Sequence, residues 1–432
     1  MTLNQEQLEE TVRAVGAEVT RRLETDADSD STPEQERSRA RRLARVVLDE
    51  RAGRALSAGQ TVLAPETEQD IQRRVVARVC GLGPLEELLE DPEIENINLT
   101  GTAVWVRYAD GTRAQLDPIV DTPDELVSLI RRIAADSPAG ERRFDAAAPI
   151  LDMPLSDGSR LNAVLDVAHQ PAVSIRRHRY RTTGLGQLRR LGTLEPVVEK
   201  LLSAVVRARR NIVISGGTGA GKTTLLRALA AEIPAQERVV TIEDVPELAL
   251  ERDVQAHPDA VALHARPANT EGKGEITVAD LVRAALRMSP DRVIVGETRG
   301  SETVPLLTAM SQGNDGSLTT LHAASSQGAF AKFGAYAALS SERLPLEATS
   351  LLVGSAVHMV VHLDATPQGE RRVTSVREVV GSDGAQVLSN EIYRHDASGS
   401  APPSPHTAHA LQEAGFDPAL LMGEASSNGY RP

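Results

Sequence analysis

The sequence is poor in the features that mark secreted or membrane-spanning proteins. It has one cysteine, Cys80, among 432 residues, so no intramolecular disulfide can form, as expected for a reducing cytosol. No uncharged apolar run reaches the roughly 18 residues needed to cross a bilayer. The longest candidate, residues 351–361, is too short and contains His358. Aromatic residues make up only 2 % of the chain, so its cores must be built mostly from Ala, Val, Leu and Ile.

The chain also lacks an excess of positive charge, because 60 acidic residues outnumber 47 Lys and Arg residues. The net charge of −13 argues against non-specific nucleic-acid binding as the main task. Residues 1–16 are polar and acidic, unlike a secretory signal peptide. We therefore expect a cytoplasmic protein that lacks a transmembrane segment, does not bind nucleic acid directly, and depends on a partner for any place at a membrane.

Two kinds of structure are predicted for the first 180 residues. Residues 1–80 have apolar positions at helical spacing, interrupted by an Asp- and Ser-rich mobile loop that starts at Thr25. This helical region is either a docking arm or a solvated appendage. Residues 81–180 contain alternating strand-like segments, a turn at residues 110–111 and a helical segment. They predict a smaller α+β domain.

From about residue 195 the pattern changes to short apolar strands separated by helices. NIVISG, VVTIED, RVIVGE and SLTTLHA are strand-like. Strands that alternate with helices predict an α/β fold with a parallel sheet covered on both faces. We expect a linker at residues 181–194, an α/β core at 195–381, and a polar C-terminal tail with one short helix at 382–432.

The stretch ISGGTGAGKTTLL contains the strongest motif in the chain. Gly216, four further residues and then Gly221, Lys222 and Thr223 form a complete P-loop between an expected strand and an expected helix. The glycines let backbone N–H groups turn inward around phosphate oxygens, and the helix start adds its positive end. Lys222 would reach the β- and γ-phosphates of ATP, and Thr223 would hold Mg²⁺. The predicted phosphate-binding residues are Gly216, Gly217, Thr218, Gly219, Ala220, Gly221, Lys222, Thr223 and Thr224.

Acidic residues end two of the other expected strands. VVTIED ends in Glu243 and Asp244, and RVIVGE ends in Glu297. In an open α/β sheet the carboxyl ends of the strands lie beside the P-loop, where phosphoryl transfer needs Mg²⁺ and an oriented water. Either acid alone could be an ordinary surface residue. Two such strand ends after a P-loop favour catalysis, with Glu297 reaching Mg²⁺ through a water.

One histidine, His322, ends the strand-like segment SLTTLHA. If this strand belongs to the same sheet, its end also lies on the nucleotide side. His322 could then donate a hydrogen bond to the γ-phosphate and lose it on hydrolysis. The alternative is a structural histidine, hydrogen-bonded at a strand end.

These motifs resemble, in their order along the chain, those of the type II/type IV secretion superfamily ATPases, especially the branch that powers tight-adherence (Flp-type) pilus assembly. GGTGAGKTT resembles the Walker A box and TIEDVPEL the aspartate box. RMSPDRVIVGETRG resembles the atypical Walker B box, and GNDGSLTTLHA the histidine box. NTEGKGEITVADLVRAALRM and DGSRLNAV are similar to stretches of the pilus branch. The resemblance covers about residues 70–400.

The resemblance implies a cytoplasmic homohexameric ATPase whose subunits carry an N-terminal domain and a RecA-like P-loop NTPase core. Hydrolysis would move the two domains, and an inner-membrane platform protein would receive the work at the inner face of the cell membrane. By position, Lys222 and Thr223 match the nucleotide-binding residues and Glu297 the catalytic Walker B glutamate. Glu243 matches the aspartate-box acid, and His322 the histidine-box residue.

Arginines are expected to act at the same site. Arg160 and Arg176 fall where the family carries arginines that neutralise transition-state charge, in cis or from a neighbouring subunit. The alternative is a solvated basic edge, including SIRRHRYR at 174–181, that pairs with the protein's own carboxylates. Arg299, just beyond Glu297, is expected to be a structural ion-pair partner.

Some residues depart from the family pattern. After the histidine box the family usually continues with Asn and Pro and then a helix that carries an arginine. Here the run is AASSQGAFAKFGAYAALS, in which Lys332 is the only basic residue. His358 stands where an acidic residue is common. The helix after the histidine box is therefore expected to contact its neighbours differently.

Three functions remain open from the sequence. The first is a pilus-assembly or secretion motor, which EGKGEITVADLVRAALRM favours. The second is a conjugation-type ATPase that helps export DNA or effectors. The third is a P-loop module that binds nucleotide and regulates with little turnover, against which the intact Glu243, Glu297 and His322 argue.

Overall fold

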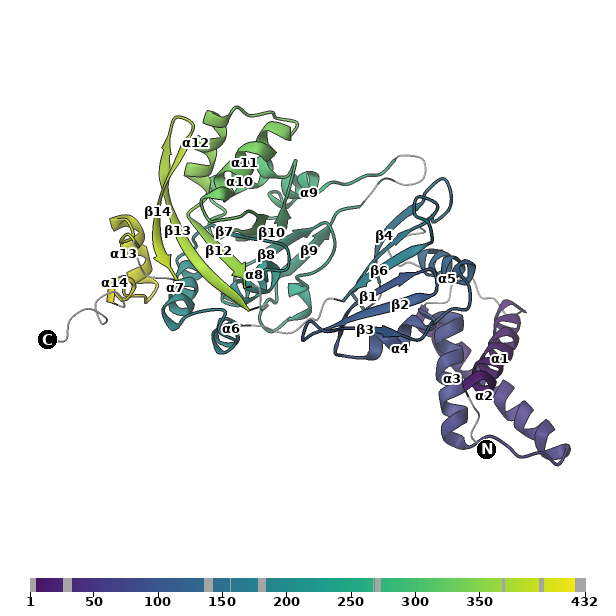
Figure 1. Ribbon diagram of the computed structural model, residues 1–432. Helices are drawn as coiled ribbons and strands as arrows, with labels where there is room; N and C mark the ends of the chain where they lie inside the picture. Colours follow the sequence, from purple (N-terminus) through teal and green to yellow (C-terminus); the bar gives the residue numbers. More distant parts are fainter. Residues whose placement is uncertain are drawn as a thin grey trace. The chain divides into compact units, whose positions relative to one another are not determined.

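The computed structural model describes most of the chain (Figure 1). The described residues are 5–25, 33–135, 143–155, 157–177, 184–266, 268, 273–366, 370–395 and 400–423. The chain divides into two compact units, Met1–His178 and Arg179–Pro432. Among the helices in these ranges, none combines the length and the apolar character that a bilayer span requires.

The N-terminal unit begins with three helices that share a small core of their own. The residues of this core come mostly from one face of each helix, and Val15, Ala44 and Val75 are fully buried in it. The three helices are α1 (Gln5–Thr25), α2 (Pro33–Ser57) and α3 (Pro65–Cys80). Helices were predicted for residues 1–80, whereas most of the predicted loop after Thr25 lies outside the described residues.

The rest of this unit is an antiparallel sheet with two helices, whereas the sequence predicted an α+β domain with one helical segment for residues 81–180. The six strands lie in the order β3-β2-β1-β6-β5-β4. Their bounds are β1 (Ile94–Thr100), β2 (Ala103–Tyr108), β3 (Arg113–Leu116), β4 (Ile150–Pro154), β5 (Arg160–Val164) and β6 (Ala172–Arg176). Alternate strand residues form one core with α4 (Leu85–Glu90) and α5 (Pro123–Ala135). The alternate residues of the opposite face are mostly polar and are partly or fully exposed.

The C-terminal unit is built on an eight-stranded sheet in the order β14-β13-β12-β7-β11-β10-β8-β9. From β12 to β9 in this order, neighbouring strands run parallel. Strand β13 is antiparallel to β12, and β14 is antiparallel to β13. The bounds are β7 (Ile212–Gly216), β8 (Val239–Glu243), β9 (Ala260–His264), β10 (Arg292–Thr298), β11 (Leu318–His322), β12 (Met359–Ala365), β13 (Arg371–Asp383) and β14 (Gln386–Arg394).

Helices cover both faces of this sheet, as the sequence predicted. Ile212 and Ile214 of β7 point into one core and Val213 into the other, because successive side chains of a strand alternate. The first core also contains α6 (Leu185–Arg190), α7 (Pro196–Arg207), α8 (Lys222–Ala230), η1 (Leu250–Arg252), α13 (Pro405–Glu413) and, at its margin, α14 (Leu420–Gly423). The second contains α9 (Val278–Ala285), α10 (Thr303–Ser311), α11 (Gly328–Leu339) and α12 (Leu346–Ala356).

The folded unit extends beyond the limits expected for the core at both ends. Leu185 and Leu188 of α6, within the expected linker, are buried against α7 and α8. The sheet also continues past residue 381, since β14 pairs along β13 in what was expected to be tail. Figure 1 shows this long hairpin along one edge of the sheet. Helix α13 then packs against α7, with Leu411 fully buried.

Candidate active site

The P-loop connects the end of β7 to the start of α8. Gly219 (φ 75°) and Gly221 (φ 96°) adopt left-handed backbone conformations that residues with a Cβ rarely adopt. A Cβ on Gly216 would lie 2.5 Å from the carbonyl oxygen of Leu363, so a larger residue would collide with β12. Residues 217–219 are exposed, and Ala220 is buried. The loop therefore presents its backbone outward at the helix start, as phosphate binding requires.

Lys222, the first residue of α8, lies under this loop with 8 % of its surface exposed. Its Nζ donates hydrogen bonds to the carbonyl oxygens of Gly217 at 2.9 Å and Gly216 at 3.2 Å. The same atom lies 3.3 Å from both ring nitrogens of His322. The predicted P-loop lysine and the predicted sensor histidine are therefore in direct contact.

His322 and Glu297 also meet, because β10 carries a bulge. The register between β10 and β11 shifts between Val295 and Thr298, and the bulge turns Glu297 towards β11. The Nε2 atom of His322 lies 3.2 Å from a carboxylate oxygen of Glu297. Burial, with help from the charge of Lys222, lowers the pKa of His322 and favours the neutral ring. With its proton on Nε2, that ring donates to Glu297 and accepts from Lys222.

Glu243, the last residue of β8, differs from Glu297 because it is buried, with 4 % of its surface exposed. Its Oε1 accepts hydrogen bonds from the backbone N–H groups of Glu247 and Leu248, both at 3.0 Å. A Cβ on Gly296 would lie 3.0 Å from Cγ of Glu243, so a larger residue there would require the Glu243 side chain to shift. Burial raises the pKa of Glu243 to about 8 in spite of the two N–H donors. At neutral pH this side chain is therefore mostly a neutral acid.

Two other residues that the sequence analysis singled out, Arg299 and His358, have structural partners. Arg299 donates to a carboxylate oxygen of Asp244 at 2.6 Å, which confirms the predicted ion pair. His358 lies at the opposite end of β7, where its Nδ1 accepts a hydrogen bond of 2.9 Å from the backbone N–H of Asn211. His358 therefore lies at the amino-terminal end of β7, whereas the P-loop lies at the carboxyl end.

Arg160 and Arg176 lie in the N-terminal unit, on β5 and β6, where they are paired across the sheet. The guanidinium of Arg160 contacts both carboxylate oxygens of Asp152, at 3.0 and 2.5 Å. Arg176 ends β6 and is exposed. Part of the basic segment 174–181 lies outside the described residues. A role for either arginine in catalysis stays a prediction.

Sequence reasoning missed His362, which lies beneath the P-loop on β12. It is paired with Ser215 in the sheet, and its Nδ1 lies 2.9 Å from the Ser215 Oγ. Its Nε2 lies 3.3 Å from a carboxylate oxygen of Asp364. Burial lowers the pKa of His362, which keeps the ring neutral. No local signal marks this residue, because its partners depend on the pairing of two strands far apart in sequence.

The residues present fit a nucleotide with Mg²⁺ better than a metal held by protein alone. In the part of the chain that the structure describes, no group of three or more His, Cys, Asp or Glu side chains could hold a metal ion. Mg²⁺ commonly binds through one or two protein oxygens together with phosphate oxygens and waters. Thr223, partly exposed at the start of α8, can supply one such oxygen, and Glu297 can act through a water.

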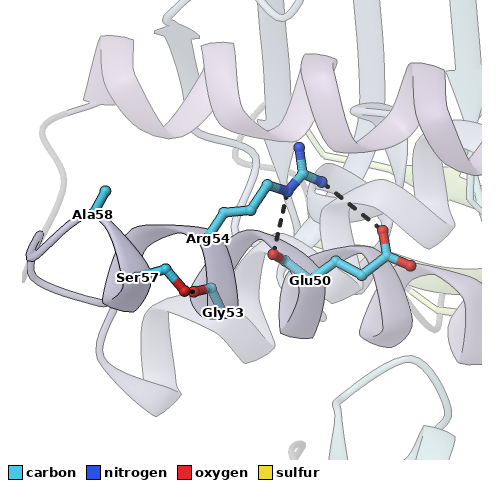
Figure 2. A pocket seen from close by; sticks show the side chains of 5 residues that line it. All are labelled: Glu50, Gly53, Arg54, Ser57 and Ala58. Atoms are coloured by element: carbon cyan, nitrogen blue, oxygen red, sulfur yellow. Dashed lines mark hydrogen bonds and ion pairs between the residues drawn. The ribbon is translucent and has the colours of Figure 1, made fainter.

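A separate shallow depression lies on α2 in the N-terminal unit (Figure 2). Its lining residues are Glu50, Gly53, Arg54, Ser57 and Ala58. Arg54 is hydrogen-bonded to the backbone oxygen of Glu50 and ion-paired with its side chain, as Figure 2 shows. The depression contains none of the motif residues, and its charged groups are already paired with each other.

Known proteins match a large part of this chain. Residues 81–394 match the family described as Type II/IV secretion system protein. A putative conjugal transfer protein of Mycobacterium tuberculosis (strain H37Rv) is 37% identical over 330 residues, which cover 74% of this chain and 90% of that protein. The Type IV secretion system protein VirB11 of Brucella abortus is 31% identical over 314 residues, 65% of this chain and 84% of its own.

Among solved structures, the crystal structure of the VirB11 ATPase from the Brucella suis type IV secretion system, in complex with sulphate, is 28% identical with a TM-score of 0.37. The match covers 68% of this chain and 94% of the VirB11 chain. The family match covers more than half of the chain, and it includes both the P-loop and the strand ends that surround it. This chain therefore belongs to the type II/IV secretion system protein family.

Proposed function

We propose that this protein is an ATP-hydrolysing motor of a pilus-assembly or secretion system. The observation that carries the proposal is the contact of Lys222 with His322 and of His322 with Glu297, at 3.3 and 3.2 Å. These residues come from three boxes that lie far apart in the sequence. A P-loop lysine, a carboxylate and a histidine that meet at one sheet edge can bind and hydrolyse a nucleoside triphosphate.

Binding begins at the P-loop, whose N–H groups and helix start would hold the phosphates of ATP. Lys222 would exchange its bonds to the carbonyl oxygens of Gly216 and Gly217 for bonds to the β- and γ-phosphates. Thr223 would hold Mg²⁺, which, when bound, neutralises charge that develops on the phosphate oxygens. The exposed backbone of residues 217–219 supports this assignment.

Glu297 would then orient the attacking water and accept its proton, as an ionised carboxylate can. Glu243 is a poorer base at neutral pH because its raised pKa keeps it mostly protonated. His322 would hydrogen-bond the γ-phosphate and return to Glu297 and Lys222 after hydrolysis. This exchange would make the histidine a sensor of the third phosphate.

Turnover would take place in a homohexameric ring at the inner face of the cell membrane. The core would be RecA-like, and movement of the N-terminal domain would act on an inner-membrane platform protein. Arg160 and Arg176 would neutralise transition-state charge at the nucleotide site, in cis or across a subunit boundary. For this role Arg160 would have to leave Asp152 and contact the phosphates instead. Support comes from the family and from the Flp-type sequence stretches.

The test is ATP hydrolysis by the purified chain, with its mass measured by light scattering in the presence of ATP. We expect a hexamer with Mg²⁺-dependent turnover. Lys222→Ala should abolish hydrolysis and weaken ATP binding strongly, since the phosphates lose their fixed positive partner. Near-normal hydrolysis by a folded Lys222→Ala variant would contradict the proposed site. Tight ATP binding without turnover by the wild type would favour the regulatory module instead.

A conjugation-type secretion ATPase is the second candidate. The relatives from Mycobacterium tuberculosis and Brucella abortus carry conjugal transfer and type IV secretion names. The neighbouring genes separate the two functions. Prepilin and platform-protein genes beside this one would support pilus assembly, whereas relaxase genes would support conjugation.

A further inference from the structure

A second basic side chain, Arg371, lies against the P-loop. It is the first residue of β13 and pairs with Ala365 of β12. A Cβ placed on Gly221 would lie 3.2 Å from Cδ of Arg371 and 4.0 Å from its Nε. Gly221 immediately precedes Lys222, so the guanidinium of Arg371 lies within reach of the phosphates that the loop would hold.

In the described part of the chain, no residue forms a hydrogen bond or an ion pair with the guanidinium of Arg371. Its side chain is exposed. The neighbouring Arg372 is different, because it contacts the ring of His395 and lies 3.9 Å from Glu370. His395 in turn contacts Glu195 at 2.7 Å. Arg372 therefore belongs to a structural network, whereas Arg371 is available to a ligand.

The order of the strands places Arg371 on a definite side of the nucleotide. β12 and β13 lie on one side of β7, while β11, β10 and β8 lie on the other. Glu297 and His322 approach Lys222 from the β10–β11 side, where the γ-phosphate must be for hydrolysis. Arg371 approaches the loop from the opposite side. Its reach therefore covers the part of the ligand away from the γ-phosphate.

We propose that Arg371 binds the α- and β-phosphates of the nucleotide, the part that ATP and ADP share. The proposal rests on the ATP-binding function proposed above. Arg371 would be a binding residue supplied by the same subunit, distinct from Arg160 and Arg176. It would stabilise the ATP and ADP states equally, and hence lower KM without changing kcat.

The experiment compares Arg371→Ala with Arg372→Ala, which removes the same charge from the next position of the strand. Affinities for ADP and for a non-hydrolysable ATP analogue are measured by titration calorimetry, and kcat and KM from ATP turnover. In Arg371→Ala, both affinities should fall together by about 10- to 100-fold, the range for a lost hydrogen bond to a charged group. The KM should rise by a similar factor while kcat stays within about two-fold. Arg371→Lys should be intermediate, since it keeps the charge but loses the fork of donors.

Three results would overturn the proposal. The first is unchanged affinity for both ligands. The second is a loss confined to the ATP analogue together with a fall in kcat, which would move Arg371 to the γ-phosphate side. The third is an equal loss in Arg372→Ala, which would reveal a general effect of charge or of β13. Thermal unfolding without ligand checks that each variant is folded, and a wild type that fails to bind either nucleotide would instead contradict the proposed function.

Discussion

Replacing the buried Glu243 by glutamine should change how the stability of the core depends on pH. Burial raises the pKa of this carboxyl from its ordinary 4.5 to about 8. The folded protein therefore holds the proton more tightly than the unfolded chain does. The contribution of Glu243 to the free energy of unfolding consequently falls as the pH rises from about 4.5 to 8, and it stops falling above the folded pKa. Glutamine keeps the size and the acceptor oxygen but cannot ionise.

The size of the effect follows from the pKa difference. Each pKa unit corresponds to about 1.4 kcal/mol. The span from 4.5 to about 8 therefore sets an upper limit of about 5 kcal/mol for the advantage that Glu243→Gln gains over the wild type. Even a third of this limit would separate the melting temperatures by about 3–6 °C in a unit of this size.

Melting temperatures of the nucleotide-free proteins should be measured by circular dichroism from pH 5.0 to 8.5. The wild type and Glu243→Gln should melt at similar temperatures at the acidic end, because both side chains are neutral in the folded protein and the pH is still close to the unfolded pKa of Glu243. The gap should widen steadily towards pH 8. Glu347→Gln makes the same substitution at an exposed position in the first turn of α12, and this control should melt in parallel with the wild type.

Parallel melting curves for Glu243→Gln and the wild type at every pH would contradict a raised pKa for Glu243. They would mean that Glu243 ionises in the folded protein as easily as in water. Burial and the neighbouring carboxylates would then be offset by the N–H groups of Glu247 and Leu248. Glu243 would in that case be an ionised acid at neutral pH and a second candidate for the catalytic base.

Three further variants test the residues around the P-loop. Glu297→Gln should keep ATP affinity while kcat falls by about 100-fold or more, and an unchanged kcat would move the catalytic role to Glu243. His322→Ala should weaken ATP relative to ADP by about 5- to 150-fold, whereas an unchanged ratio with a lower apo melting temperature would identify a structural histidine. Gly296→Ala should destabilise the core by about 1–3 kcal/mol in denaturant unfolding, because its Cβ would press on Cγ of Glu243. A Glu243→Ala background should relieve that cost, and an equal cost there would place the strain elsewhere.

Much of the site could be predicted because its signals are local. The P-loop requires a strand before it and a helix after it, and GGTGAGKTT has both, at β7 and α8. Glu297 and His322 could be placed at one edge because parallel strands end on the same side of a sheet. The contact between these two residues depends on a β-bulge at Gly296 and Glu297, which the sequence alone does not reveal.

Other parts of the site could not be predicted because they depend on pairing over long distances. The position of β12 beside β7 brings His362 to Ser215 and carries Arg371 to Gly221. Neither residue is marked by its own surroundings in the sequence. The hairpin of β13 and β14 was expected in part to be a polar tail that starts near residue 382. Instead β13 continues to Asp383, and residues 384–385 form the turn to β14.

The strand that carries the P-loop has consequences for how the protein is made. β7 pairs with β11 and β12, which begin at Leu318 and Met359, long after Gly216 has left the ribosome. Until then, nascent β7 has no partner on either edge. A translation product cut short before residue 318 would contain the whole GGTGAGKTT motif and still lack the neighbours that shape the loop. Such fragments should not bind ATP, and their open strand edges should send them to chaperones and proteases before they could enter a ring.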